Sequence, residues 1–120
     1  MLKVFSVVSF LLLCGCKKSD TLAPVITVSA PGNDQVFTGG QTVLVKATIT
    51  DDQSVHMVHV TVLDNLTDGH VVHFEQHTDS RSYEVNQSFQ AIAGRSYTID
   101  IEAADHADNT ATKKLTVSAN

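Results

Sequence analysis

Apolar and polar residues alternate along most of the chain after Pro24, and this alternation limits the fold more than any other feature. In residues 42–50, valine, alanine and isoleucine occupy every second position, and Leu44 is the one apolar residue out of phase. In residues 97–103, tyrosine, isoleucine and alanine alternate with threonine, aspartate and glutamate. Because successive side chains of a strand point to opposite faces, this period of two predicts β-strands with one buried face.

Five further segments rich in β-branched or aromatic residues complete the expected set of strands. They are residues 25–29, 55–63, 70–77, 82–90 and 110–118. Turn-forming sequences such as Pro-Gly-Asn-Asp, Asp-Gly and Asp-Asn separate the segments. Seven short strands predict an all-β, immunoglobulin-like antiparallel β-sandwich, with a small β-barrel as the main alternative. The core residues expected from the alternation are Ile26, Val28, Val43, Val45, Val58, Val60, Val62, Val85, Phe89, Ile99 and Ile101.

The first 15 residues differ sharply in composition from the rest and predict a cleaved secretory signal. Lys3 supplies a positive start, and residues 4–13 are apolar apart from two serines. This run is about half of the roughly 20 residues that a membrane-spanning helix needs, which disfavours a permanent transmembrane anchor. A chain of 120 residues then has room for one globular domain, expected at residues 24–120, and not for two.

Residues 13–16, Leu-Cys-Gly-Cys, close the apolar run and resemble the lipobox of bacterial lipoproteins. The resemblance implies that Cys16 carries a thioether-linked diacylglyceryl group, that the chain is cut before Cys16, and that the freed amine is acylated. Residues 16–23 then form a lipidated tether that reaches at most ~25 Å. An ordinary secretory signal with two incidental thiols is the alternative. Lys17 stands where aspartate retains some Gram-negative lipoproteins in the inner membrane, which favours the outer membrane.

The charge balance of the cleaved chain argues against a nucleic-acid partner. Loss of Lys3 leaves seven basic against thirteen acidic residues, a formal net charge of −6, whereas phosphate backbones are bound by basic patches. With Cys16 lipidated and Cys14 removed, no cysteine remains in the folded part, so its core alone must hold it together. We expect two partners: the membrane, through the lipid, and an unidentified protein or glycan.

Both ends of the expected domain resemble bacterial Ig-like domains. The opening half does so in Ala-Pro-Val-Ile-Thr-Val (residues 23–28), Pro-Gly-Asn (31–33), Gly-Gln-Thr-Val (40–43) and Ala-Thr-Ile-Thr-Asp-Asp (47–52). The closing half does so in residues 93–99, which look like their glycine-tyrosine strand, and 104–112, which look like their Ala-Asp-x-x-Gly-Asn turn.

Asp108 stands where this turn usually has glycine. Because aspartate tolerates the left-handed conformation less well than glycine, we expect a reshaped turn. The histidine-bearing middle of the domain also looks similar to a family of short Ig-like lipoproteins of unknown function in Gram-negative bacteria. The resemblance implies an exported, often surface-attached module used for spacing, adhesion or binding, and it implies no catalysis.

Histidines are the most conspicuous chemical feature, and five of the six fall on the hairpin expected over residues 55–77. His73, Glu75 and His77 share one face of an extended strand, and His59 of the partner strand is expected opposite them. Imidazoles and a carboxylate that converge there would bind zinc, copper or nickel. The alternative function is therefore a metal-binding lipoprotein that uses a His-rich β-hairpin. An exposed polar face or a pH-responsive surface also fits, because a one-residue slip moves every side chain to the other face.

Acidic residues form a second candidate site. In an Ig-like sandwich the B–C and F–G loops lie at the same end, which would gather Asp51, Asp52, Asp105, Asp108 and Asn109. Oxygen ligands in flexible loops suit calcium. The alternative is that these residues are turn formers and solvated charges, and no EF-hand spacing is present.

Catalytic motifs of the common enzyme classes are absent from the sequence. It has no nucleophile elbow, phosphate-binding glycine loop or HExxH pair, and no cysteine in the expected domain. Aromatic platforms for carbohydrate are scarce as well, since the chain has no tryptophan and only Phe37 and Phe74 are candidates for exposure. We expect a non-enzymatic module that requires no cofactor, with a transition metal or Ca²⁺ as the candidate ligands of the two sites above.

Overall fold

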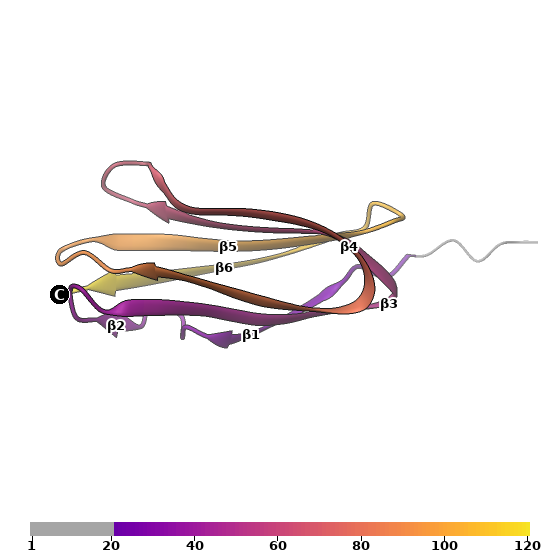
Figure 1. The fold of residues 1–120 in the computed structure, drawn as a ribbon, viewed down its shortest axis with the longest axis horizontal. Coiled ribbons are helices and arrows are strands. Elements are labelled where there is room, and N and C mark those ends of the chain that lie inside the picture. The colour runs from indigo at the N-terminus through magenta and orange to yellow at the C-terminus, as the bar shows by residue number, and fades with distance from the viewer. Residues whose placement is uncertain (1–20) are drawn as a thin grey trace, which may run out of the picture.

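The computed structural model describes residues 21–120, which form strands and turns and contain no helix (Figure 1). The strands are β1 (Val25–Ala30), β2 (Val36–Phe37), β3 (Thr42–Asp64), β4 (His70–Gln90), β5 (Ser96–Asp105) and β6 (Thr110–Ala119). All seven predicted strand segments are confirmed within these elements, and β2 is a further strand that the sequence did not predict. Nothing in this part of the chain is a helix that could cross a membrane. The predicted signal peptide (residues 1–15) and Cys16 lie outside the described residues.

Two long strands, β3 and β4, each run through both layers of a sandwich. The first half of β3 pairs with β1, as in Ile49 opposite Ile26, and with the second half of β4. The second half of β3 pairs with the first half of β4 and with β5, as in Val60 opposite Phe74 and Ile101. Strand β6 pairs with β5 and, in parallel, with β2. Figure 1 shows the resulting two layers, which are those of the predicted immunoglobulin-like sandwich.

Each long strand bends where it passes from one layer to the other. In β3 the pairing with β4 shifts register between Thr50 and Val55. Asp51 holds this bend, because its Oδ1 accepts hydrogen bonds of 3.0 Å from the backbone N–H groups of Gln53 and Ser54. Irregularities of this kind turn a strand and re-aim the side chains beside it. The Asp-Asp turn predicted between two strands is therefore a bend inside one strand.

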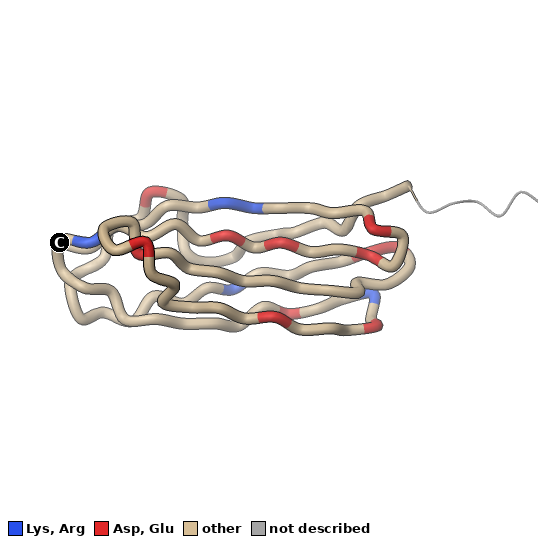
Figure 2. The backbone as a smooth tube through the Cα atoms, turned by 90° about the horizontal axis from the view of Figure 1, so that it is seen from above, with Lys and Arg blue, Asp and Glu red and all other residues tan. Residues whose placement is uncertain are grey.

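The two bends and the β5–β6 turn lie at the same end of the sandwich, where the described chain begins (Figure 1). We call this the entry end. Figure 2 shows several acidic positions gathered there. The C-terminus and the β3–β4 loop lie at the opposite end (Figure 1).

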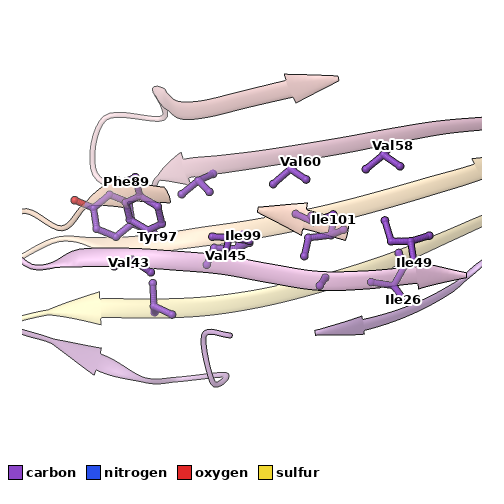
Figure 3. Packing of buried hydrophobic residues seen from close by; sticks show 14 of the residues in the cluster. Ile26, Val43, Val45, Ile49, Val58, Val60, Phe89, Tyr97, Ile99 and Ile101 are labelled. Atoms are coloured by element: carbon purple, nitrogen blue, oxygen red, sulfur yellow. The ribbon is translucent and has the colours of Figure 1, made fainter. Parts of the chain in front are cut away.

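Side chains from both layers fill the space between them (Figure 3). All core residues predicted from the alternation are buried, except Val28, which packs partly buried against the same cluster. Leu44, the residue out of phase, is 46% exposed. Phe37 is buried and Phe74 packs partly buried against the core, so their prediction as candidates for an exposed platform is wrong. Burial worth about 1.5 to 3 kcal/mol per large apolar side chain opposes the entropy of the unfolded chain.

Tyr97 ties the start of β5 to the turn that precedes it. Its side chain is 1% exposed, and its ring centroid lies 4.8 Å from that of Phe89. The Tyr97 hydroxyl oxygen accepts a 2.9 Å hydrogen bond from the backbone N–H of Ile92. This contact resembles the tyrosine corner of Ig-like sandwiches.

A partly buried ion pair lies at the end of β3. The carboxylate of Asp64, a residue that is 3% exposed, pairs with the Arg95 guanidinium and accepts a 2.9 Å hydrogen bond from the backbone N–H of Leu66. Burial raises the pKa of Asp64, but the Leu66 hydrogen bond and the Arg95 charge lower it more. The pKa of Asp64 therefore lies below its ordinary value.

Candidate functional site

The pairing of β3 with β4 decides which of the predicted metal ligands meet. His59 lies directly opposite Glu75, and Thr61 lies opposite His73. Nε2 of His59 is 3.1 Å from Oε2 of Glu75, and Nε2 of His77 is 3.3 Å from Oε1 of Glu75. Two of the three predicted histidines thus contact the carboxylate of Glu75, the fourth predicted residue.

The two imidazoles hold the Glu75 carboxylate in its ionised form. The side-chain contact with His59 and the charge of protonated His59 are the largest causes that lower the pKa of Glu75, burial opposes them, and His77 lowers it further. Nε2 of His59 is buried, and its 3.1 Å approach to Glu75 falls short of hydrogen-bond geometry.

His73 does not join this group. It lies two residues before Glu75 on the same strand, and its ring packs edge-on against that of His70, with the centroids 5.8 Å apart. No group of three or more His, Cys, Asp or Glu side chains in residues 21–120 is arranged to hold a metal ion. The predicted transition-metal residues are therefore not assembled as one site in this structure.

A second group of histidines, which the sequence did not predict, lies at the entry end. The ring of His56 is in contact with two others, at a centroid distance of 5.5 Å from His77 and 4.1 Å from His106. The interplanar angles are 69° and 36°. We call His56, His77 and His106 the three-histidine cluster. Its members come from β3, from β4 and from the β5–β6 turn.

A bulge and a turn bring His56 and His106 together. Val55 pairs with Asp105, and Met57 pairs with the preceding residue of β5, so His56 is the extra residue of a β-bulge. His106 follows Asp105 as the first residue of the β5–β6 turn. A signal in the sequence could have found this group. The rule that places the B–C and F–G loops at one end, which grouped the acidic residues, applies equally to the histidines beside them.

Asp79 of β4 supports the three-histidine cluster. Its Oδ1 lies 3.0 Å from Nε2 of His106 and accepts a 2.7 Å hydrogen bond from the Ser54 hydroxyl. The Ser54 hydrogen bond and then the contact with His106 hold the pKa of Asp79 below its ordinary value. An ionised carboxylate only accepts hydrogen bonds, so Nε2 of His106 is the donor in this contact.

Residues of the predicted calcium site hold turns. Oδ1 of the fully buried Asp105 accepts 2.9 Å hydrogen bonds from two backbone N–H groups of the β5–β6 turn, one of them that of Asn109. The Asn109 side-chain amide donates to Oδ2 of Asp105 at 2.9 Å. Asp51 holds the bend of β3, and Asp52 and Asp108 are exposed. Within residues 21–120 these five residues are not arranged around an ion site.

Asp108 keeps the backbone conformation that glycine would take. Its φ is 62°, which lies in the left-handed region that aspartate visits more readily than most non-glycine residues. Asp108 thus adopts the left-handed conformation itself, and the expectation of a reshaped turn stays a prediction.

Comparison with known proteins identifies the family. A family model described as "Bacterial Ig domain" matches residues 24–117. Among solved structures, fibronectin(III)-like modules of CbhA from Clostridium thermocellum match with a TM-score of 0.53 and 19% identity. That match covers 82% of this chain and 47% of the other, so this chain spans about half the length of that relative. No curated protein matches the chain.

Two structures of a β-glucosidase from Listeria innocua, in complex with gluconolactone and with glucose, resemble the chain more weakly. Their TM-scores are 0.39 and 0.38 at 8% and 10% identity, over 80% of this chain and 16% of theirs. Likeness at this level carries no argument about activity. The fibronectin-like modules share the sandwich with this chain, and the family model covers almost all of it. The chain therefore belongs to the bacterial Ig domain family.

Proposed function

We propose that this protein is a lipid-anchored, non-enzymatic Ig-like module of the bacterial envelope that acts in binding, adhesion or structural spacing. The observation that carries the proposal is the spacing of two features along the chain. Only seven residues, 17–23, separate the lipobox-like residues 13–16 from residue 24, where the match to the family begins. Ig-like sandwiches commonly serve as binding or structural modules at cell surfaces.

The direction in which the chain enters the sandwich supports this role. The described residues begin at the entry end, and the C-terminus lies at the opposite end (Figure 1). A lipid on Cys16 would hold the entry end within the tether's ~25 Å of the membrane. The opposite end is then free for a protein or glycan partner. Lys17 favours the outer membrane, with the domain on its periplasmic or surface face.

The use of the buried carboxylates supports a non-enzymatic role. The buried polar side chains in residues 21–120 are Asp51, Asp64 and Asp105. Each accepts hydrogen bonds from backbone N–H groups and so holds a bend or a turn of the chain. These three carboxylates are therefore used to hold the backbone, which supports a structural role for them.

Lipid anchoring is tested by blocking cleavage of the signal and, separately, by replacing the cysteine expected to carry the lipid. Globomycin, which inhibits cleavage of lipoprotein signals, is expected to make the precursor accumulate. Cys16→Ala is expected to release the protein from the membrane fraction and to abolish labelling with radioactive palmitate. Cys14→Ala is the matched control, because its thiol leaves with the signal, and membrane retention is expected to persist. Unchanged retention of the Cys16→Ala protein would contradict the proposal.

A further inference from the structure

We propose that the open edge of β4 is an interaction surface that pairs with β4 of a second copy of this chain and so forms a symmetric dimer. In residues 21–120, β3 is the only strand that pairs with β4. Figure 1 shows the first half of β4 at the border of its layer, with β3 on one side and the other side open. Every second residue of such a strand points its backbone N–H and C=O away from the sheet, where another strand can pair with them. The dimer goes beyond the proposed function and does not depend on the lipid anchor.

The other sheet edges of the described domain are protected against pairing, and that of β4 is not. Strand β2 has two residues, and β1 has six, with a register shift between Val28 and Ala30 and with Pro31 directly after it. Short edge strands, bulges, proline and lysine are the usual means by which proteins prevent edge pairing. Strand β4 has 21 residues with neither proline nor lysine, and its pairing with β3 runs without a shift from Val72 to His77. This segment is therefore the edge at which another strand can add.

The core leaves the inner side chains of this segment incompletely covered. Val72 and Phe74 lie opposite Val62 and Val60 of β3. The two β3 residues are fully buried, whereas Val72 and Phe74 are only partly buried against the core. A strand added beside β4 would place its own inner side chains against Val72 and Phe74 and remove apolar surface from water.

The sequence of β4 is complementary to itself in one antiparallel register. Centred on Phe74, this register places His73 of each copy opposite Glu75 of the other copy, and Phe74 opposite its own counterpart. Oppositely charged side chains and paired aromatic rings stabilise neighbouring strands when they lie directly opposite each other. His73 and Glu75 are exposed and share the outer face of the sheet. Both histidine–glutamate pairs of the dimer therefore lie at its surface.

Neighbouring registers are less favourable. A shift of the pairing by one residue puts inner side chains of one copy opposite outer side chains of the other. A register centred on Glu75 puts this carboxylate opposite its own counterpart, and like charges directly opposite destabilise a pair of strands. A register centred on His73 leaves Glu75 opposite Val71, and one centred on Gln76 reaches the bend of β4, where its pairing with β3 is irregular. The register centred on Phe74 is therefore the one that we expect.

Antiparallel pairing sets the entry ends of the two copies at opposite ends of the paired strands. On one membrane, a dimer of lipid-anchored copies would lie with its strands along the surface. The tether's reach of ~25 Å allows both entry ends to be anchored in this orientation. The proposed anchor therefore neither requires the dimer nor prevents it.

Sedimentation equilibrium of the full-length chain tests the dimer directly. The chain is studied in a detergent matched in density to the buffer, with micelles in excess over protein and a reductant that excludes disulfides through Cys14 or Cys16. A monomer–dimer equilibrium is expected with a dissociation constant of about 1–100 µM, because pairing along one short stretch of strand is a small interface. A chain that stays monomeric throughout this range of concentration would overturn the proposal.

Two substitutions of one exposed side chain should move the dissociation constant in opposite directions. His73→Arg places a permanent cation opposite Glu75 of the second copy and is expected to lower the constant about 3-fold or more, since symmetry makes each change twice. His73→Glu places like charges opposite each other and is expected to raise it about 3-fold or more.

Ser88→Glu is the matched control for these variants. Ser88 is exposed on the same strand but outside the paired segment, so the substitution adds a negative charge without changing the pairing, and the dissociation constant is expected to stay at the wild-type value. Shifts in the same direction for both His73 variants, or a shift of the control as large as that of His73→Glu, would overturn the proposal.

Disulfide crosslinking locates the twofold axis. In the expected register residue 74 faces its own counterpart with the Cβ atoms about 4.5–5.5 Å apart, which is near the distance that a disulfide spans. Phe74→Cys is expected to form covalent dimers under mild oxidation, in excess of any that the wild type forms through Cys14 and Cys16. Val72→Cys and Gln76→Cys are the controls, because each residue lies four positions, ~13 Å, from its own counterpart. Crosslinking that is strongest at a control position would overturn the proposed pairing.

Discussion

Removal of the Tyr97 hydroxyl should destabilise the sandwich although it leaves the core volume almost unchanged. Tyr97→Phe keeps the buried ring and its 4.8 Å contact with Phe89. It deletes the oxygen that accepts the 2.9 Å hydrogen bond from the Ile92 backbone. The turn between β4 and β5 then loses its attachment to the start of β5.

The magnitude follows from two contributions. A typical hydrogen bond contributes about 0.5–1.5 kcal/mol net to stability, and a donor left without a partner costs about 1–3 kcal/mol if it is fully buried. Ile92 is 51% exposed, so water partly replaces the lost acceptor and the total stays near 1–2 kcal/mol. For a domain of this size, that corresponds to a fall in Tm of roughly 5–15 °C.

Thermal unfolding followed by far-UV circular dichroism measures this effect. Tyr83→Phe is the control, because Tyr83 is also partly buried against the core but its hydroxyl makes no hydrogen bond within residues 21–120. The control variant is expected to unfold within a few degrees of the wild type. The role assigned to the hydroxyl would be refuted if the Tyr97→Phe protein unfolded at the wild-type temperature. It would also be refuted if the fall in Tm were no larger than that of Tyr83→Phe.

Three further substitutions test the turns and the ion pair. The pKa of Asp64 lies below its ordinary value of 3.8, so the ionised carboxylate stabilises the fold above that pH, and this stabilisation is lost as the pH falls through the lowered pKa. Asp64→Asn is therefore expected to lower Tm at neutral pH, to leave Arg95 without its partner, and to flatten the decline of Tm between about pH 5 and pH 2. Asp108→Gly relieves a positive φ and is expected to raise stability by about 0.5–1 kcal/mol in chemical denaturation. A Cβ added at Gly39 would meet Cβ of Ala93 at 2.6 Å and its backbone N at 2.9 Å, so Gly39→Ala is expected to lower stability by about 1–3 kcal/mol.

Two of these substitutions have a matched control, and the third has an outcome that would contradict it. Asp52→Asn removes an exposed carboxylate. In this variant Tm should still decline with falling pH as in the wild type, and more steeply than in Asp64→Asn. Gly32→Ala places a Cβ no closer than 3.6 Å to any neighbour and should be nearly neutral, so an equal loss in both glycine variants would contradict the packing argument. Destabilisation by Asp108→Gly would show that the aspartate side chain contributes more than its backbone conformation costs.

The strands and the core could be predicted because both depend on local patterns. Alternation of period two marks which side of each strand is buried, whatever that strand pairs with. Two features depended on long-range pairing. Strand β2 has only two residues, Val36 and Phe37, and forms because β6 lies beside it. The Asp-Asp sequence of β3 is a bend and not a break, because the neighbouring strands pair on both sides of it.

The contacts of the candidate sites also divide into those that local patterns predict and those that long-range pairing decides. The sequence predicted that His59 lies opposite the face that carries His73, Glu75 and His77, and the register of β3 against β4 decided that its partner is Glu75. The rule that places the B–C and F–G loops at one end could bring His56 and His106 to the same end of the sandwich. The contact between their rings depends in addition on a bulge in β3 and on the β5–β6 turn, which the sequence does not fix. Contacts between residues fifty positions apart are set by the register of whole strands, and one extra residue in a ladder redirects a side chain. The sequence alone therefore determined the fold class and the inward faces, through local alternation, and only the tertiary structure decided which polar side chains meet.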